Sequence, residues 1–368
     1  MNTADIASAT TLITPTGSDH PTFDLLLYDE PTHYWGSYHN QTGLFSGITS
    51  LTDGRGYMYR NVNDVIASFK GDIHSGDVTY AVSYTPTIDE AENPLKGFNL
   101  IGNPFTYNIT FENISLSAGE ALTGGYILKK DGEWGAKLDV DATIAPCEGV
   151  LVQVTAAATA TISHTAKGGS KSNKDYIGFT VANSKYEDVA YALFDKGHGL
   201  NKIDHINPDV PMVYINYYDK DYAIATLGNE VKSFDLNFKA KTMGSYTLGY
   251  EANGEFKYLH IIDRFTGKDI DMLEVKEYSF IASPSDDEAR FVVRLQKKSD
   301  EGMVNFAYQS GNDIIVSGEG ELQVFDMLGR FVMSKRINGV ETVNVNTAGV
   351  YILRLVGDEI LTQKIVVK

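Results

Sequence analysis

One cysteine, eight histidines and several groups of carboxylates are the side chains in this sequence that could do chemistry. Cys147 lies between a proline and Glu148, and it could act as a nucleophile only if the fold brought a histidine to it. A free cysteine at the start of a strand is more often a small buried apolar residue, and this is the interpretation that we prefer. The histidines stand singly along the chain, at positions 20, 33, 39, 74, 164, 198, 205 and 260.

The short motifs that usually mark an active site are missing from the sequence. It contains no Gly-x-Ser-x-Gly turn, no phosphate-binding loop, no His-Glu-x-x-His pair and no Cys-x-x-Cys pair. We therefore predict no catalytic residues and no enzymatic activity.

Three groups of acidic residues could in principle supply the oxygen ligands that calcium requires. None has the spacing of an EF-hand loop, so we interpret them as solvated turns and predict no metal site and no cofactor, with calcium as the alternative. The three groups are Asp219 with Asp221, Asp263 with Asp269 and Asp271, and Asp286 with Asp287 and Glu288.

An aromatic segment early in the chain is the candidate ligand-binding site. It contains Tyr34, Trp35 and Tyr38, with His33 and His39 beside them. Such a segment could form a platform that faces a sugar, although packing within a core or a hairpin is the more common use of clustered aromatic residues.

Composition narrows the classes of partner. The chain has 368 residues and a formal net charge of −17, which argues against nucleic acid and anionic membranes, because both require basic patches. No apolar run approaches the length of about 18 residues that a membrane span needs, so we predict no transmembrane segment. A single cysteine excludes an intramolecular disulfide framework.

The first residues, Met1 to Asp5, lack the basic and apolar regions of a signal peptide. We expect that a signal has been removed or that the chain is a fragment of a longer protein.

Abundant tyrosine, phenylalanine and glycine, with short apolar runs, predict an all-β fold. We expect two β-sandwich modules of jelly-roll type, over residues 1–167 and 168–298, and a small immunoglobulin-like sandwich over residues 299–368. Strands are predicted at 97–102 and 149–154 in the first module. In the terminal module they are predicted at 313–317, 321–325, 330–335, 341–345, 350–355 and 359–367.

The terminal module carries three short motifs in order. An apolar strand ends in Asp326-Met327-Leu328-Gly329-Arg330, Gly349-Val350-Tyr351 follows, and the last strand runs from Lys364 to Lys368. This module resembles the type A C-terminal domain of Bacteroidetes proteins that are exported by type IX secretion. The positions that match the family's signal are Gly329, Arg330, Gly349, Tyr351, Lys364 and Lys368.

The resemblance implies an extracellular or outer-membrane-surface protein that is read by the type IX translocon. In that family a sortase often removes the domain and attaches the remaining protein to surface lipopolysaccharide. A purely structural role for the three motifs is the alternative, since Gly329 suits a hairpin position with positive φ and Tyr351 would point inward.

The first module resembles a recurring pattern in surface proteins of Prevotella- and Bacteroides-like bacteria, and the second resembles the block that commonly follows it. The strand that usually opens this pattern is only partly present, which suggests a module truncated at its start. The matching stretches are 27–30, 34–38, 54–59, 98–105 and 145–149, then 258–267 and 277–280.

Together these features predict a non-catalytic structural or adhesive surface protein, with a glycan or a host protein as its ligand. One alternative is a carbohydrate-binding module, which an exposed strip formed by Tyr34, Trp35, Tyr38, Tyr217, Tyr218 or Tyr222 would favour. Another is the non-catalytic C-terminal part of a secreted hydrolase.

Overall fold

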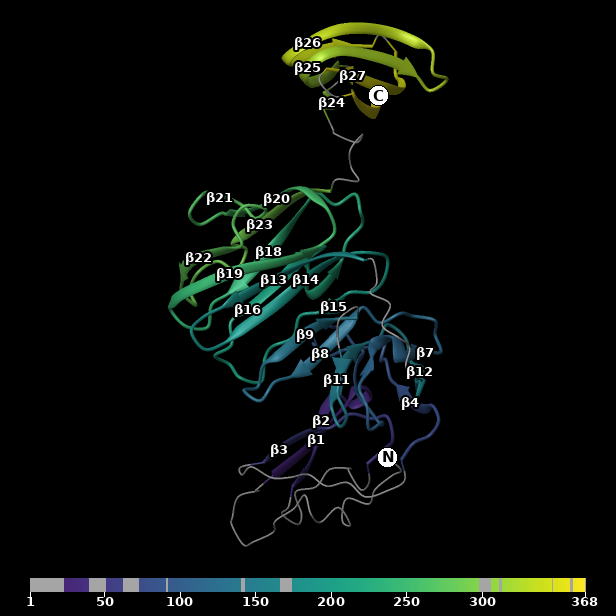
Figure 1. The fold of residues 1–368 in the computed structure, drawn as a ribbon, viewed down its shortest axis with the longest axis vertical. Helices are drawn as coiled ribbons and strands as arrows, with labels where there is room; N and C mark the ends of the chain where they lie inside the picture. The colour runs from purple at the N-terminus through teal and green to yellow at the C-terminus, as the bar shows by residue number, and fades with distance from the viewer. Residues whose placement is uncertain are drawn as a thin grey trace. The chain divides into compact units, whose positions relative to one another are not determined.

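The computed structural model describes residues 23–39, 51–61, 73–90, 92–139, 143–165, 174–297, 306–310, 313–345, 347–357 and 360–367 (Figure 1). Over these residues the regular structure is β-strand, apart from two single-turn 3-10 helices. The prediction of an all-β chain built from β-sandwich modules is confirmed. No helix in the described residues is long and apolar enough to cross a membrane.

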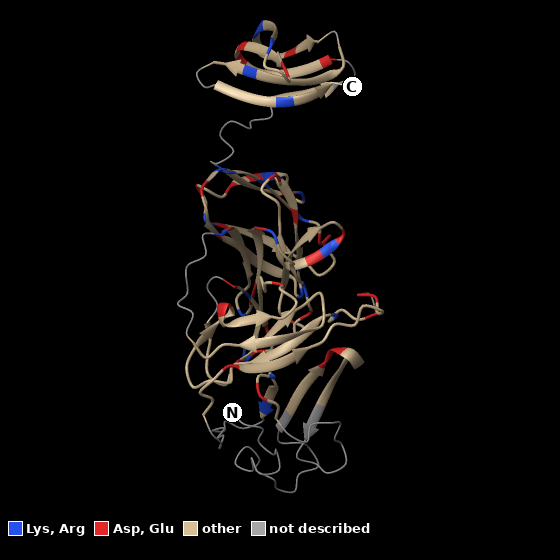
Figure 2. Ribbon diagram, turned by 90° about the vertical axis from the view of Figure 1, so that its right-hand side faces the viewer, with Lys and Arg blue, Asp and Glu red and all other residues tan. Residues whose placement is uncertain are grey.

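Contacts within the chain divide it into two compact units. One comprises residues 1–254 and 259–294, and the other comprises residues 255–258 and 295–368. The predicted module boundaries at 167/168 and 298/299 both lie outside the described residues. Acidic and basic residues are scattered over the strands and loops of both units (Figure 2).

The first module contains four sheets in the described residues, with strand orders β2-β1-β3, β10-β6, β5-β11-β8-β9 and β4-β12-β7. Its elements are β1 (Phe23–Asp29), η2 (Glu30–Thr32), β2 (Tyr34–His39), β3 (Met58–Asn61), β4 (Val78–Val82), β5 (Phe98–Gly102), β6 (Ile109–Thr110), η3 (Phe111–Asn113), β7 (Ile114–Leu116), β8 (Gly124–Leu128), β9 (Trp134–Leu138), β10 (Thr143–Ile144), β11 (Gly149–Gln153) and β12 (Ala158–Ile162).

The four-stranded sheet of this module is buried on both faces, which explains why β5 and β11 are mostly apolar rather than alternating apolar and polar. One face, including Ile101 and Val150, packs against the β4-β12-β7 sheet. The other face, including Leu100 and Leu151, packs against residues of the second module such as Ile224. The two predicted sandwich modules therefore share a hydrophobic core.

The second module is an eleven-stranded sheet in the described residues, with strand order β21-β20-β23-β18-β16-β17-β14-β13-β19-β22 and with β15 paired to β17. Its strands are β13 (Asp175–Ala182), β14 (Glu187–Phe194), β15 (Leu200–Asn201), β16 (Met212–Tyr217), β17 (Lys220–Thr226), β18 (Ser233–Lys239), β19 (Gly244–Asn253), β20 (Phe256–Asp263), β21 (Lys268–Asp271), β22 (Glu277–Ala282) and β23 (Phe291–Lys297).

The two ends of this sheet are joined by side chains. Arg290 donates two hydrogen bonds to Asp263 at the end of β20, at 3.1 and 2.9 Å, and a third to the Ile281 carbonyl of β22 at 2.9 Å. Tyr278 of β22 also donates to Asp263, at 2.9 Å. The Arg290 guanidinium lies 4.4 Å from the ring centre of Phe280, a favourable cation–π contact. We call these polar contacts the seam.

The terminal module is one five-stranded antiparallel sheet in the described residues, in which β24, β25, β27 and β28 follow in order and β26 pairs with β25. Its strands are β24 (Ala307–Ser310), β25 (Asp313–Asp326), β26 (Phe331–Asn344), β27 (Gly349–Val356) and β28 (Ile360–Val367). Its core cluster is drawn from residues 306–367 alone.

The prediction of separate strands at 313–317 and 321–325 is wrong, because both lie in β25, and those at 330–335 and 341–345 lie in β26. Gly318 and Gly320 separate the two halves of β25 with φ of +148° and +143°. The first half pairs with β24 and the second with β27. At Gly320 a Cβ would lie 2.4 Å from the Val356 carbonyl oxygen, so glycine lets the strand bend without a turn.

The first and last strands of this module are joined by a side-chain amide. Gln363 of β28 accepts a hydrogen bond from the Ala307 backbone N–H at 2.8 Å and donates one to the Ala307 carbonyl. This pair of bonds resembles a rung of a β-ladder, and it closes the sheet over its own core.

Candidate functional site

The turn from Asp326 to Arg330, which we call the hairpin tip, connects β25 to β26. Its Gly329 has φ of +76°, the conformation that the final position of a three-residue hairpin loop requires. Asp326 accepts hydrogen bonds through Oδ1 from the backbone N–H groups of Leu328 and Arg330, at 2.9 and 3.0 Å. The residues of the Asp-x-x-Gly-Arg motif therefore account for the conformation of this turn.

Arg330 combines a local ion pair with high exposure. Its Nε lies 2.6 Å from Asp326 Oδ2, yet 75% of its side chain is exposed. The backbone N–H of Arg330 is the main cause that lowers the pKa of Asp326, and the Arg330 side chain adds to it. Met327 and Leu328 beside it are also exposed. The tip thus presents a cation and two apolar side chains on a well-defined turn.

The register of the sheet places Lys364 of the sequence motif in one row with three apolar residues. Phe331 pairs with Phe325, Phe325 with Ile352, and Ile352 with Lys364. Paired residues of antiparallel strands point to the same face, and their inward neighbours, including Leu353 and Ile365, are buried. We call these four outward residues the outer row.

Gly349 and Tyr351 belong to a different structural motif, a tyrosine corner. The buried Tyr351 hydroxyl donates to the Thr347 carbonyl at 2.8 Å and lies 2.7 Å from the Thr347 hydroxyl. The second module has the same arrangement, in which Tyr246 donates to the Thr242 carbonyl at 2.6 Å. Both follow the pattern Thr-x-Gly-x-Tyr, a repeated signal through which the sequence could have revealed Thr347 and the corner.

Replacing Tyr351 by phenylalanine is expected to cost the terminal module about 1–3 kcal/mol, because the Thr347 carbonyl loses a buried donor. Tyr246→Phe should produce a loss of the same size in the first unit only. Amide hydrogen exchange, followed on peptides from each unit, measures both. If either substitution changed the protection of the two units by the same amount, this structural role would be contradicted.

Of the remaining predicted sorting residues, Lys364 is exposed on β28 and Lys368 lies outside the described residues. Asp326 pairs with Tyr351, and Tyr351 with Ile365, so the hairpin tip and the corner lie at the same end of the sheet. The structure thus brings Gly329, Arg330, Gly349, Tyr351 and Lys364 to one end of the terminal module.

The aromatic candidates of the first module do not form one strip. Tyr34 is 75% exposed, whereas Trp35 packs onto Tyr28 with ring centres 5.2 Å apart. Neighbouring residues of a strand point to opposite faces, so Tyr34 and Trp35 cannot present one flat surface. Tyr38 belongs to β2, and its side chain lies outside the described residues.

The polar residues of the recurring surface-protein pattern form hydrogen bonds with the backbone of the module itself. Glu30 is buried and accepts from the backbone N–H groups of Thr85 and Gly97, at 2.8 and 3.1 Å. The buried amides of Asn99 and Asn103 donate to backbone carbonyls of neighbouring loops. These residues act as internal supports of the first module.

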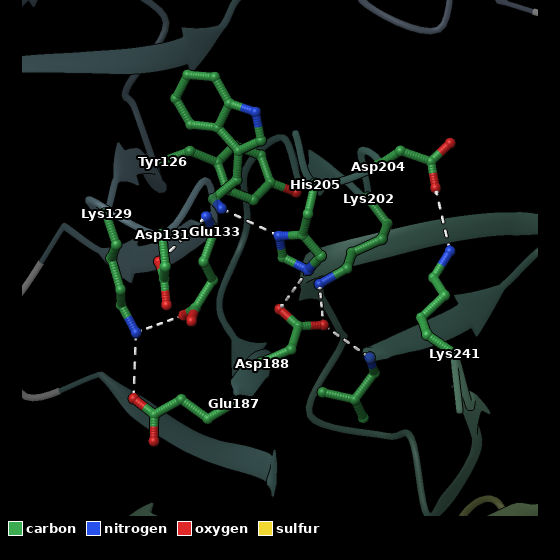
Figure 3. Close-up of polar contacts among 12 residues, drawn as sticks. Tyr126, Lys129, Asp131, Glu133, Glu187, Asp188, Lys202, Asp204, His205 and Lys241 are labelled. Carbon is green, nitrogen blue, oxygen red and sulfur yellow. Dashed lines mark hydrogen bonds and ion pairs between the residues drawn. The ribbon is translucent and has the colours of Figure 1, made fainter. Parts of the chain in front are cut away.

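A buried ionic group lies where the first and second modules meet (Figure 3). Asp188 of β14 accepts from Lys202 at 2.5 Å and from the Val213 backbone N–H at 2.7 Å. His205 Nε2 lies 3.4 Å from the other Asp188 oxygen. All three side chains are almost fully buried. We call Asp188, Lys202 and His205 the junction cluster.

The polar atoms of the junction cluster face one another and the neighbouring backbone. The Trp134 backbone N–H donates to His205 Nδ1 at 3.0 Å, so this nitrogen carries no proton, and Nε2 faces Asp188. Burial raises the pKa of Asp188, but Lys202 and His205 outweigh burial, and the pKa is lowered overall. Because Nδ1 already accepts a hydrogen bond and Nε2 faces a buried carboxylate, the His205 ring is not placed to act as a general base on a bound substrate.

The other predicted chemical residues are engaged locally. The interpretation of Cys147 as a small buried residue is wrong, because this cysteine is exposed in a turn with φ of +63°. The interpretation of Asp263 as a solvated turn residue is wrong, because its carboxylate is buried against Arg290 in the seam. Asp269 lies 2.7 Å from His260. Asp286 accepts from the Ser283 backbone N–H at 2.9 Å. Among the described residues no three His, Cys, Asp or Glu side chains converge on a point that could hold a metal ion.

The comparisons return no relative. No family model matches the chain, and no match was found among curated proteins or among solved structures. The function must therefore be argued from the residues and their geometry.

Proposed function

We propose that this chain is a non-catalytic cell-surface protein that is exported by type IX secretion and that residues 299–368 are its sorting domain. The observation that carries the proposal is the exposed end of the terminal module, where the hairpin tip and the outer row lie together. Gly329, Arg330 and Lys364 of the sorting-family motif lie on this surface, within a module whose core cluster is its own. The translocon, a sortase and surface lipopolysaccharide are the partners that this proposal implies.

Two kinds of residue are combined in the sorting motif. Gly329 and Tyr351 shape the module, while Arg330 and Lys364 are exposed. A receptor contacts exposed groups, and aromatic residues and arginine are enriched where proteins bind. We therefore place the surface read by the translocon on Arg330, Phe331 and Lys364, and assign the export role to this surface.

A matched pair of glycines tests this proposal. Gly329 and Gly339 have φ of +76° and +85°, and a Cβ at either position would meet nothing within 4 Å. Alanine at each should therefore cost a similar ~1–2 kcal/mol in backbone strain. We expect Gly329→Ala to lose most of its surface display in a host with type IX secretion, and Gly339→Ala to be displayed normally. Immunodetection on intact cells, with total protein as reference, measures this.

A second pair separates recognition from folding. Arg330→Ala should reduce display, whereas Arg336→Ala, which removes an exposed cation within β26, should not. Equal losses for Gly329→Ala and Gly339→Ala would assign the effect to folding. Normal display of all four variants, or of a chain that lacks residues 299–368, would show that this module is not the export signal.

A further inference from the structure

The turn between β16 and β17 carries an unusual pair of residues. Tyr217 pairs with Lys220, so the loop is the two residues Tyr218 and Asp219. Both have positive φ, +51° and +59°. Asparagine and glycine fill such turns easily, but a bulky side chain in this conformation is a strained exception. Strain that persists in a structure often marks a functional position.

The strained residue presents its ring to solvent. Tyr218 is 84% exposed, and its ring centre lies 4.4 Å from that of Tyr217 at an interplanar angle of 62°. Tyr217 thus supports one side of the Tyr218 ring. Lys220 also ties the hairpin to another loop, through an ion pair of 2.8 Å with Glu90. The ring is therefore displayed on a supported element, which lowers the entropy cost of binding.

The polar groups of the same hairpin suit hydroxyl groups better than charges. Asn216 donates to Asp221 at 2.8 Å on the exposed surface of the same hairpin, and Asp219 is in the turn. Carboxylates accept hydrogen bonds from neutral hydroxyls, and amides both donate to them and accept from them, while the acidic side chains and the net charge of −17 repel anions. A nucleic acid would instead require a basic groove beside the stacking ring.

We propose that the β16–β17 hairpin is a binding site for a neutral oligosaccharide, with the apolar face of a sugar ring stacked on Tyr218 and its hydroxyls bonded to Asn216 and Asp221. A protein partner would typically need about 800 Å² on each side, far more than one exposed ring provides. The inference goes beyond the proposed export and does not depend on it, because it is tested on the purified chain.

Tyr218→Asn tests the site, because asparagine tolerates the left-handed conformation. The wild-type chain should be retarded in native gels that contain at least one soluble neutral polysaccharide from a panel of β-glucan, mannan and xylan. Tyr218→Asn should bind about tenfold more weakly or worse. Its thermal midpoint should be unchanged or higher, because the backbone strain is relieved. Tyr218→Trp, which keeps a flat ring, should retain binding.

Tyr308→Thr is the matched control, since Tyr308 is an exposed strand tyrosine of the terminal module. It should bind as the wild type does. The proposal is overturned if no polysaccharide retards the wild-type chain, or if Tyr218→Asn binds unchanged. It is equally overturned if Tyr308→Thr loses binding to the same extent, because binding would then not be specific to the hairpin.

Discussion

Asp188→Asn is expected to destabilise the first unit by about 3–5 kcal/mol. The carboxylate of Asp188 accepts hydrogen bonds from Lys202 and from the Val213 backbone N–H, and it lies 3.4 Å from His205 Nε2. An amide at this position brings no negative charge, so the buried Lys202 ammonium would be left without its counter-ion. Urea unfolding followed by tryptophan fluorescence measures the loss, since Trp134 donates to His205 within the same contacts.

Asp204→Asn provides the matched control. Asp204 is two residues from Lys202 in sequence, but its side chain is 84% exposed and its ion pair with Lys241 is 4.0 Å long. Exposed pairs of this kind contribute between zero and about 1 kcal/mol. Comparable losses for Asp188→Asn and Asp204→Asn would mean that the junction cluster does not hold the modules together.

Asp263→Asn in the seam is expected to cost about 3–5 kcal/mol at neutral pH, because it leaves the buried Arg290 without a counter-ion. Burial raises the pKa of Asp263, but hydrogen bonds from Arg290 and Tyr278 outweigh burial and lower it overall. A carboxyl with a lowered pKa in the folded state contributes its full stabilisation above its unfolded pKa, about 4. This contribution is lost as the pH falls below that value.

The difference in unfolding free energy between wild type and Asp263→Asn should therefore be constant from about pH 7 to pH 5 and shrink below about pH 4. Asp235→Asn is the control, because it removes the partner of an exposed arginine, Arg264, at 2.8 Å. It should cost less than about 1 kcal/mol. If the difference in unfolding free energy between wild type and Asp263→Asn did not change with pH, the ionised carboxylate of Asp263 would not be what stabilises the seam.

The sequence predicts the class of fold because that class depends on local patterns. β5 and β11 lie within the predicted strands at 97–102 and 149–154. The prediction of two strands where the structure has β25 is caused by the two glycines that bend this strand. Glycine in a strand pattern is read as a turn, and only the pairing with β24 and β27 shows that the strand continues.

The buried ionic groups could not be predicted in the same way. Asp188 and Lys202 are 14 residues apart, and Asp263 and Arg290 are 27 apart, and no local period connects them. Each of these residues looks like an ordinary surface charge in the sequence. Their roles depend on which strands the fold makes neighbours, and that information is not local.

Part of the candidate site can be predicted from the sequence. The turn chemistry of Gly329 follows from its sequence, and so does the inward direction of Tyr351. The sequence names Tyr218 among the six aromatic residues of a possible exposed strip, but it gives no sign of the residue's left-handed backbone. A two-residue loop of Tyr218 and Asp219 departs from the residues that such turns prefer, so no rule of turn composition indicates it.

The tyrosine corner occurs twice in this chain, at Thr242–Tyr246 and at Thr347–Tyr351, with the same hydrogen bond in each. A feature that is present in two modules cannot tell a receptor which of them to select. If the terminal module is a sorting signal, the tyrosine corner cannot be the part that a receptor recognises. The receptor would then distinguish the modules by the hairpin tip and the outer row.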